Sequence, residues 1–355
     1  MRIMFLSIIL AITCLSPSIM YPCTTFCFWE EDAWVFGRNY DWSIEDCMIM
    51  INKRGVQKTA FTRDNPATWT SRYGSITFNQ YGREFPLGGM NEAGLVIECM
   101  WLEGAEYPPA DTRYGLSELQ WVQYQLDMHK TVEQIIQSDT EARITRQNSV
   151  PLHFLACDRS GHAAVIEFLE GKMAAYTKED LPTSALTNHT YEYSLEFLGE
   201  CNGSETESSF ATADYSLKRF VWAAHGVTSW DANADTSAVG YAFEILEKTA
   251  VDFTMFRVVY DVGNNLIYFM NRSNPRIRSI KFDEFDLSCT QPVKVLDIST
   301  GEGGDVTSLF TDYSFEANYD LITRAYAGTS FLQTFSEETR RTVAAYPATT
   351  ECQDK

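Results

Sequence analysis

The sequence is short of basic residues. Lysine and arginine together number 28, against 48 aspartates and glutamates, so the formal net charge is −20. Nucleic acids and anionic membranes both bind through clusters of positive charge. The shortage of positive charge therefore argues against a nucleic acid or an anionic membrane as a partner. Any anionic substrate would have to be attracted by individual arginines.

Long apolar runs are missing after the first residues. The one near the start, residues 3–15, follows Arg2 and is too short to span a bilayer, a pattern typical of a secretory signal peptide. We expect cleavage near Ser18 and later removal of a remnant ending at Pro22, so that residues 1–22 are signal peptide and short pro-segment. The sequence thus predicts no membrane span and a periplasmic or secreted protein.

Metal-binding cysteine patterns, internal repeats and interdomain linkers are also missing. The nine cysteines are widely and irregularly spaced, which gives no zinc pattern, and their disulfide pairing stays open. Charged residues make up 21% and aromatic residues 14% of the chain, as in globular proteins. We interpret residues 23–355 as one catalytic domain.

Strand-like and helix-like stretches alternate along the chain. A capping box, Thr131 with Gln134, predicts the start of one helix, and residues 201–214 are polar and predicted to be a loop. Runs at both ends of the chain favour strands, and they enclose helical blocks. This order predicts an α+β fold, a four-layer αββα sandwich of two antiparallel sheets flanked by helices. We expect strands over 26–29, 34–40 (joined by an acidic turn at 30–32), 94–101, 153–157, 163–168, 253–260, 266–270 and 277–282, and further helices over 116–126, 218–225 and 242–248.

Cys23 is the strongest candidate for a catalytic residue. If it becomes the first residue, its thiol is a nucleophile, and its α-amine, with a pKa of about 8, can accept the proton. Arg38 could favour the thiolate, and Asp41 could hold the amine. Spacing alone would more often indicate an exposed ion pair. Residues three apart on a regular strand face opposite sides, so Asp41 must lie where the strand bends or ends.

Five short motifs occur in a fixed order along the chain. They resemble those of the choloylglycine hydrolase family, whose members are bile salt hydrolases and penicillin V acylases with the N-terminal-nucleophile (Ntn) hydrolase fold. The resemblance covers residues 23 to about 282. The motifs are Cys23-Thr24-Thr25-Phe26, Gly37-Arg38-Asn39-Tyr40-Asp41-Trp42, Gly89-Met90-Asn91-Glu92-Ala93-Gly94-Leu95, Leu186-Thr187-Asn188 and Lys218-Arg219-Phe220.

The resemblance implies catalytic roles for five residues. Cys23 is the nucleophile and its amine the base, Arg38 lies beside the sulfur, and Asp41 hydrogen-bonds the amine. Asn188 donates its side-chain amide to the oxyanion, and Arg219 completes the charged network. No metal or organic cofactor is implied. The segment between Asn188 and Arg219 is shorter than the assembly loop of Gram-positive members, which leaves a homo-oligomer, tetramer or dimer, open.

Trp101 occupies the position at which bile salt hydrolases of Gram-positive bacteria carry an asparagine that borders the oxyanion. The resemblance implies an oxyanion contact from its backbone N–H. An aromatic side chain there suits a flat aryl group and narrows the room for a sterol. Trp42, Phe26 and Met100 are candidates for further pocket walls, with core packing as the other interpretation of each.

These observations predict an exported acylase that cleaves a linear amide with an apolar acyl group. Penicillin V acylases and N-acyl homoserine lactone acylases are the nearest functional types. A conjugated bile salt hydrolase is the alternative, and a secreted non-enzymatic protein that binds lipid-like amides is a lesser one. A papain-like protease is excluded, because no Cys-Gly-Ser-Cys-Trp signature surrounds any cysteine.

Overall fold

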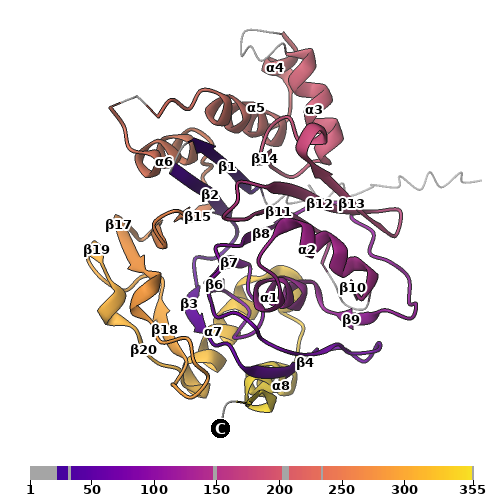
Figure 1. The fold of residues 1–355 in the computed structure, drawn as a ribbon, viewed down its shortest axis with the longest axis vertical. Coiled ribbons are helices and arrows are strands. Elements are labelled where there is room, and N and C mark those ends of the chain that lie inside the picture. The colour runs from indigo at the N-terminus through magenta and orange to yellow at the C-terminus, as the bar shows by residue number, and fades with distance from the viewer. Residues whose placement is uncertain (1–21, 31–32, 147–149, 202–207, 233–234, 354–355) are drawn as a thin grey trace, which may run out of the picture.

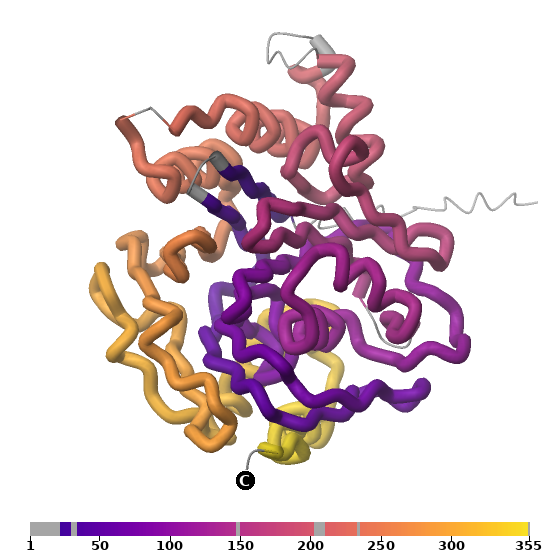
Figure 2. Tube along the Cα trace, viewed as in Figure 1, coloured from indigo at the N-terminus to yellow at the C-terminus, as the bar shows by residue number. Residues whose placement is uncertain are grey.

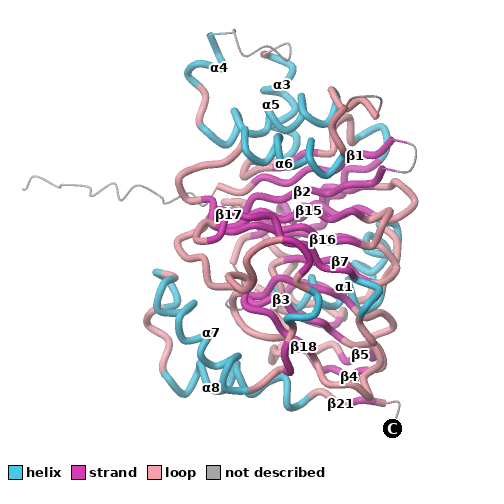
Figure 3. The backbone as a smooth tube through the Cα atoms, turned by 90° about the vertical axis from the view of Figure 1, so that its left-hand side faces the viewer, coloured by secondary structure: helices cyan, strands magenta, loops and turns pink. Residues whose placement is uncertain are grey.

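Two stacked β-sheets with helices on their outer faces make up the protein (Figures 1 and 3). The computed structural model describes residues 22–30, 33–146, 150–201, 208–232 and 235–353. Helices, sheet, sheet and helices follow one another in layers, so the predicted α+β sandwich is confirmed. Among the described residues, no helix combines the length and apolarity needed to cross a membrane.

The first sheet, in the order β14-β1-β2-β15-β16-β17-β19, carries the N-terminal cysteine motif in β1, next to its edge strand β14. Its neighbouring strands pair antiparallel, except that β17 and β19 are parallel. Helices α5 and α6 pack on β1 and β2. The bounds are β1 Thr24–Glu30, β2 Ala33–Asp41, β14 Ala185–Leu186, β15 Thr254–Asp261, β16 Leu266–Asn271, β17 Asn274–Lys281, β19 Gly304–Asp305, α3 Tyr191–Glu200, α4 Ser208–Thr212, α5 Tyr215–Thr228 and α6 Ala238–Lys248.

The second sheet is antiparallel throughout, in the order β13-β12-β11-β8-β7-β6-β3-β18-β20. Helix α1 packs on β7 and β8. The bounds are β3 Met48–Asn52, β6 Ser75–Asn79, β7 Gly88–Asn91, β8 Val96–Trp101, β11 Leu152–Cys157, β12 Ala163–Leu169, β13 Lys172–Thr177, β18 Lys294–Asp297, β20 Thr311–Asp312, α1 Glu118–Met128 and α2 Val132–Gln137.

Smaller elements complete the structure around these layers. Strands β4 Val56–Thr59, β5 Thr68–Thr70 and β21 Glu351–Cys352 form one small sheet, and β9 Tyr114–Leu116 pairs with β10 Ala142–Ile144. Helices α7 Phe315–Gly328 and α8 Glu337–Ala345 follow the last long strand. The short 3₁₀ turns are Ser138–Thr140, Lys178–Asp180, Phe282–Glu284, Thr307–Leu309, Ser330–Leu332 and Tyr346–Thr349.

The core lies between the two sheets, as apolar side chains of both inner faces meet there. The ring of Phe78 on β6 lies 6.0 Å from that of Phe256 and 6.2 Å from that of Phe269, both on the first sheet. All three side chains are buried. Aromatic pairs at this spacing stabilise a packed interface beyond the area they bury.

Most of the predicted elements are present within a few residues of their expected bounds. The capping box is confirmed, since the Thr131 hydroxyl accepts a hydrogen bond from the Gln134 amide at the start of α2. The loop prediction for 201–214 is wrong over α4, because Phe210 is buried against α5 and its packing outweighs the polar composition. The predicted turn at 30–32 and the predicted leader fall largely outside the described residues.

The C-terminal segment returns to the N-terminal part of the chain, where β21 lies against β4 (Figure 2). Strand β21 pairs with β4, and the Tyr346 hydroxyl donates a hydrogen bond to the Thr59 carbonyl over 2.8 Å. A disulfide joins Cys289 to Cys352, 63 residues apart in sequence. The segment is therefore fixed to the body of the protein at its end.

Replacing Cys352 with serine should lower the free energy of unfolding by about 4 kcal/mol, because the closed loop restricts the unfolded chain. Urea denaturation of the two chains, each with and without dithiothreitol, measures the effect. Dithiothreitol should destabilise the wild-type chain and leave the variant unchanged. An equal response of both chains to the reductant would contradict a stabilising disulfide.

Candidate active site

Cys23 directly precedes β1, in one wall of a cavity of about 900 Å³. Its side chain is only 3% exposed. Pro22 still precedes it, so its backbone nitrogen is an amide, which donates a hydrogen bond to the Asn188 side-chain oxygen over 2.7 Å. The Cys23 Sγ lies 3.8 Å from the backbone oxygen of Asp41. The sulfur and its nitrogen are thus both held before any substrate binds.

Strand β2 carries both Arg38 and Asp41 to this cysteine. The pairing of β2 with β15 shifts register between Thr254 and Phe256, directly opposite the end of β2 at Asp41. Such a bulge bends a strand and redirects its side chains. The expectation that Asp41 lies where its strand bends or ends is confirmed, and the bulge explains how two residues three apart reach one centre.

Arg38 is buried and held by the second sheet. Its guanidinium forms an ion pair with Glu98 and donates to the Cys99 carbonyl over 2.9 Å. Glu98 also accepts a hydrogen bond from the Tyr260 hydroxyl. Gly88 makes room, because a Cβ at this position would collide with the Glu98 carboxylate. A buried charge without such partners would be strongly destabilising.

Burial limits what Arg38 does for the thiol of Cys23. Burial raises the pKa of the Cys23 thiol, while the charge of Arg38 and, to a smaller extent, that of Arg219 oppose the increase. The charge of Arg38 thus lowers the pKa of the Cys23 thiol, as predicted. In this form of the chain, however, burial outweighs it, and the thiol holds its proton more tightly than an ordinary cysteine.

Asn188 and Arg219 bind the other side of Cys23. Arg219 donates from one guanidinium nitrogen to the Cys23 carbonyl and to the Thr24 hydroxyl, and from the other to the Asn188 oxygen over 3.0 Å. The Asn188 side-chain nitrogen, the predicted oxyanion donor, donates to the Trp101 carbonyl over 2.8 Å. The sequence prediction brought these residues together correctly, and their catalytic roles stay predictions.

Asp41 departs from its predicted contact. Its carboxylate accepts a hydrogen bond from the Thr254 hydroxyl over 2.5 Å, whereas the Cys23 nitrogen is bound by Asn188. An amide has one hydrogen to donate, and Asn188 takes it. Burial raises the pKa of Asp41 to about 7, against the opposing effects of Arg219, the Thr254 hydrogen bond and Arg38.

The raised pKa of Asp41 predicts a pH-dependent stability in the chain that keeps Pro22. The ordinary pKa of 3.8 applies to the unfolded chain and about 7 to the folded one. The contribution of Asp41 to the free energy of unfolding is therefore fully present below about pH 4, and it is lost as the pH rises through 7. Between pH 5 and pH 8 the free energy of unfolding should fall by roughly 3 kcal/mol. Urea denaturation of a Cys23→Ala chain at both pH values measures this fall.

Asp41→Asn in the same Cys23→Ala chain is the matched control. It keeps the size of the side chain and removes its titration, so the fall between pH 5 and pH 8 should shrink by that amount. An unchanged fall in the double variant would show that other groups cause it.

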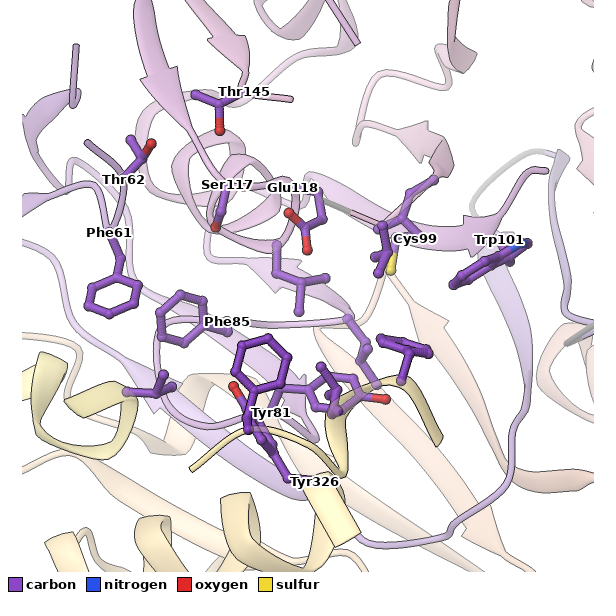
Figure 4. Close-up of a pocket in the computed structure, with 18 of the residues that line it drawn as sticks. Phe61, Thr62, Tyr81, Phe85, Cys99, Trp101, Ser117, Glu118, Thr145 and Tyr326 are labelled. Atoms are coloured by element: carbon purple, nitrogen blue, oxygen red, sulfur yellow. The ribbon is translucent and has the colours of Figure 1, made fainter. Parts of the chain in front are cut away.

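The predicted pocket residues divide into two groups. Trp101, Trp42 and Met100 line the cavity, and the two indole rings lie 6.2 Å apart. Figure 4 shows Trp101 at one end of the pocket. Phe26 does not line it. Its ring is fully buried directly beneath Gly37, where any added Cβ would collide with it. The prediction of Phe26 as a pocket wall is therefore wrong, and its core-packing interpretation holds.

Sequence reasoning missed two parts of the site. Glu98 could have been noticed as the single charge in an apolar strand, since a buried carboxylate requires a buried partner. The other part is a cavity wall from the C-terminal segment, for which no motif gave a signal. It consists of Tyr326, Phe331, Leu332, Phe335, Thr339, Thr342 and Val343.

The stacked antiparallel sheets, covered by helices and with the cysteine at the start of an inner strand, are those of the Ntn hydrolases. The chain belongs to the choloylglycine hydrolase family of linear amide C–N hydrolases, whose family model matches residues 23–295. This match confirms the resemblance on which the catalytic assignments rest.

Individual relatives agree with this assignment. The chain is 28% identical over 181 residues to the penicillin V acylase of Pectobacterium atrosepticum, a match of 46% of this chain that spans about half (48%) of the relative. Among solved structures it is similar to penicillin V acylase from Agrobacterium tumefaciens, with a TM-score of 0.68 and 24% identity over 82% of this chain and 98% of that one. A mutant of the conjugated bile acid hydrolase from Clostridium perfringens gives a TM-score of 0.65 and 16% identity over 80% and 98%. These two structures support the fold.

Proposed function

We propose that this chain is an N-terminal cysteine amidase that cleaves linear amides with an apolar acyl group. The observation that carries the proposal is the position of Cys23, at the apolar cavity and inside a buried cluster of two arginines, an aspartate and an asparagine. The family supplies the reaction class, linear amide C–N hydrolysis.

The proposed reaction begins when the Cys23 sulfur attacks the amide carbonyl carbon and its α-amine takes the thiol proton. Asn188 and the backbone at Trp101 would stabilise the oxyanion. The C–N bond then breaks, the leaving amine takes the proton from the α-ammonium, and a thioester remains on the sulfur. Water, activated by the same amine, attacks the thioester and releases the acid.

The amine exists only if the chain is cut before Cys23. One observation supports this cut: the family match begins at residue 23, directly after Pro22. Cleavage would convert the amide now bound by Asn188 into an amine next to the carboxylate of Asp41. A positive charge there favours ionised Asp41, so the cut would relieve the cost of burying that carboxylate.

Export to the periplasm or beyond is part of the proposal. The disulfide between Cys289 and Cys352 supports it, because such bonds persist mainly in oxidising compartments. Fractionation of the producing cells, with mass spectrometry of the mature N-terminus, tests both location and cut. A cytosolic protein that retains residues 1–22 would contradict export.

A penicillin V acylase-like or N-acyl homoserine lactone acylase-like activity fits the cavity better than bile salt hydrolysis. Trp42 and Trp101 place two indole rings at the Cys23 end of the cavity, where they suit flat or slender acyl groups. Turnover of penicillin V, a long-chain N-acyl homoserine lactone and glycocholate by the mature protein decides between them. A large preference for glycocholate would establish the bile salt alternative instead.

A further inference from the structure

The wall of the cavity formed by α7, α8 and the turn between them lies outside the part of the chain that matches the family. That match ends at residue 295, whereas the wall begins at Tyr326. The general family reaction therefore does not explain this segment. Its side chains nevertheless contribute apolar surface to the same cavity that Cys23 lines.

The segment is fastened to the rest of the protein along its length. The Asn318 side chain accepts a hydrogen bond from the Arg83 amide over 2.9 Å, and the Ser43 hydroxyl donates to the Gly328 carbonyl over 2.8 Å. Beyond α8, the disulfide at Cys352 fixes the end. These contacts make the segment a fixed part of the cavity. A fixed wall can select a bound group by its length, because no ordering of the wall is needed on binding.

One end of this wall lies beside the catalytic cysteine. The ring of Phe331 lies 6.5 Å from that of Trp42 and 6.1 Å from that of Trp101, while those two rings lie 6.2 Å apart. The three rings thus form a triangle at the Cys23 end of the cavity. A segment beyond the family match supplies its third member.

The other end of the wall lies at the far end of the cavity. Val343 is in α8, one turn before Tyr346, whose ring packs 5.5 Å from both Phe61 and Phe85. Phe61 and Phe85 lie across the cavity from Cys99 and Trp101 (Figure 4). Between the two ends, Tyr326 and Leu332 face the same space. The wall therefore runs the length of the cavity.

The cavity is much larger than one aryl ring requires. A cavity of about 150 Å³ is sufficient for benzene, and this one holds about 900 Å³. Its lining is mainly apolar and comes from leucine, methionine, valine and aromatic side chains, although Glu118 and Arg63 also line it. Adjustable apolar surface of this kind suits a chain of methylene groups, because each buried methylene adds to binding without a directional contact.

We infer that the C-terminal segment 326–343 is an acyl-chain ruler: a long unbranched acyl group lies along it, and Val343 limits the length accepted. The inference rests on the proposed amidase function for its kinetic readout. It names a substrate class, amides of long straight-chain fatty acids, and a part of this chain that selects them.

A chain-length series tests the ruler in the mature enzyme. For N-acylglycine amides from hexanoyl to dodecanoyl, kcat/KM should rise about fourfold per methylene. Val343→Phe fills the far end and should lower kcat/KM for the dodecanoyl substrate at least tenfold, with the hexanoyl value kept within twofold. Ile277→Phe, which adds the same ring at an exposed position outside the cavity, is the matched control and should keep both values. A flat series, or an equal loss for both substrates in Val343→Phe, would overturn the inference.

Binding to an inactive chain separates the ruler from the amidase. Calorimetry of the Cys23→Ala chain should show that dodecanoate binds and that hexanoate binds more weakly. Adding Val343→Phe should lower the affinity for dodecanoate at least tenfold. If this binding is found but no amide is hydrolysed by the active chain, the ruler stands and the proposed function falls. If dodecanoate does not bind, or cholate binds more tightly, the ruler is wrong whatever the activity.

Discussion

Replacing Cys23 with alanine should reduce amide hydrolysis by at least about a thousandfold, because the residue that forms the covalent intermediate is removed. Serine at the same position should lose nearly as much, since its hydroxyl is far harder to deprotonate than a thiol. Initial rates with an N-acyl amide measure the loss. Intact-mass spectrometry of the wild-type enzyme under turnover should show the acyl group as an adduct.

Cys201→Ala is the control for the loss of a buried cysteine. Cys201 lies at the end of α3, in a small cluster with Phe210 and Val221 away from the cavity. This variant should keep its activity and its adduct. An active Cys23→Ala enzyme, or an adduct on any other cysteine, would disprove the assigned nucleophile.

A chain that retains Pro22 should be at least about a hundredfold less active than one that begins at Cys23. The Cys23 nitrogen is then an amide whose lone pair is delocalised, and it cannot take a proton from the thiol; a lost general base typically costs this much or more. The same burial that raises the thiol pKa would leave the sulfur protonated. Initial rates of amide hydrolysis by two expressed chains, one beginning at Pro22 and one at Cys23, measure this difference.

Intact mass must accompany each activity measurement, because the Pro22 chain could process itself. Activity that appears only as the mass falls by one proline would support the amine as base. Full activity in a chain whose mass still includes Pro22 would show that the proton goes elsewhere, and the proposed reaction would then need a different base.

The fold could be predicted in large part from local patterns. Strands such as β1 and β11 are runs of apolar and aromatic residues bounded by turn signals, and α2 begins at a capping box. The helix α4 could not be predicted, since a polar segment becomes helical there only through the burial of Phe210 against α5. Local sequence does not contain that contact.

The candidate site was predictable where its residues lie in motifs and not where they meet through space. Arg38 was found beside its cysteine, but its partner Glu98 comes from the facing sheet, and Tyr260 from a neighbouring strand. The bulge opposite Asp41 depends on the register between β2 and β15, which is set by the whole ladder. The C-terminal cavity wall needs the folded chain to bring residues 326–343 back to Cys23.

The absence of a side chain at Gly88 has an evolutionary consequence. Glu98 fills the space that a Cβ at this position would take, so the two residues form one steric unit. A homologue that gains alanine at 88 must move the Glu98 carboxylate or exchange the glutamate for a smaller residue, and either change disturbs the ion pair with Arg38. Aligned descendants should therefore change positions 88 and 98 together, and this covariation would identify the members that share the neutralised arginine.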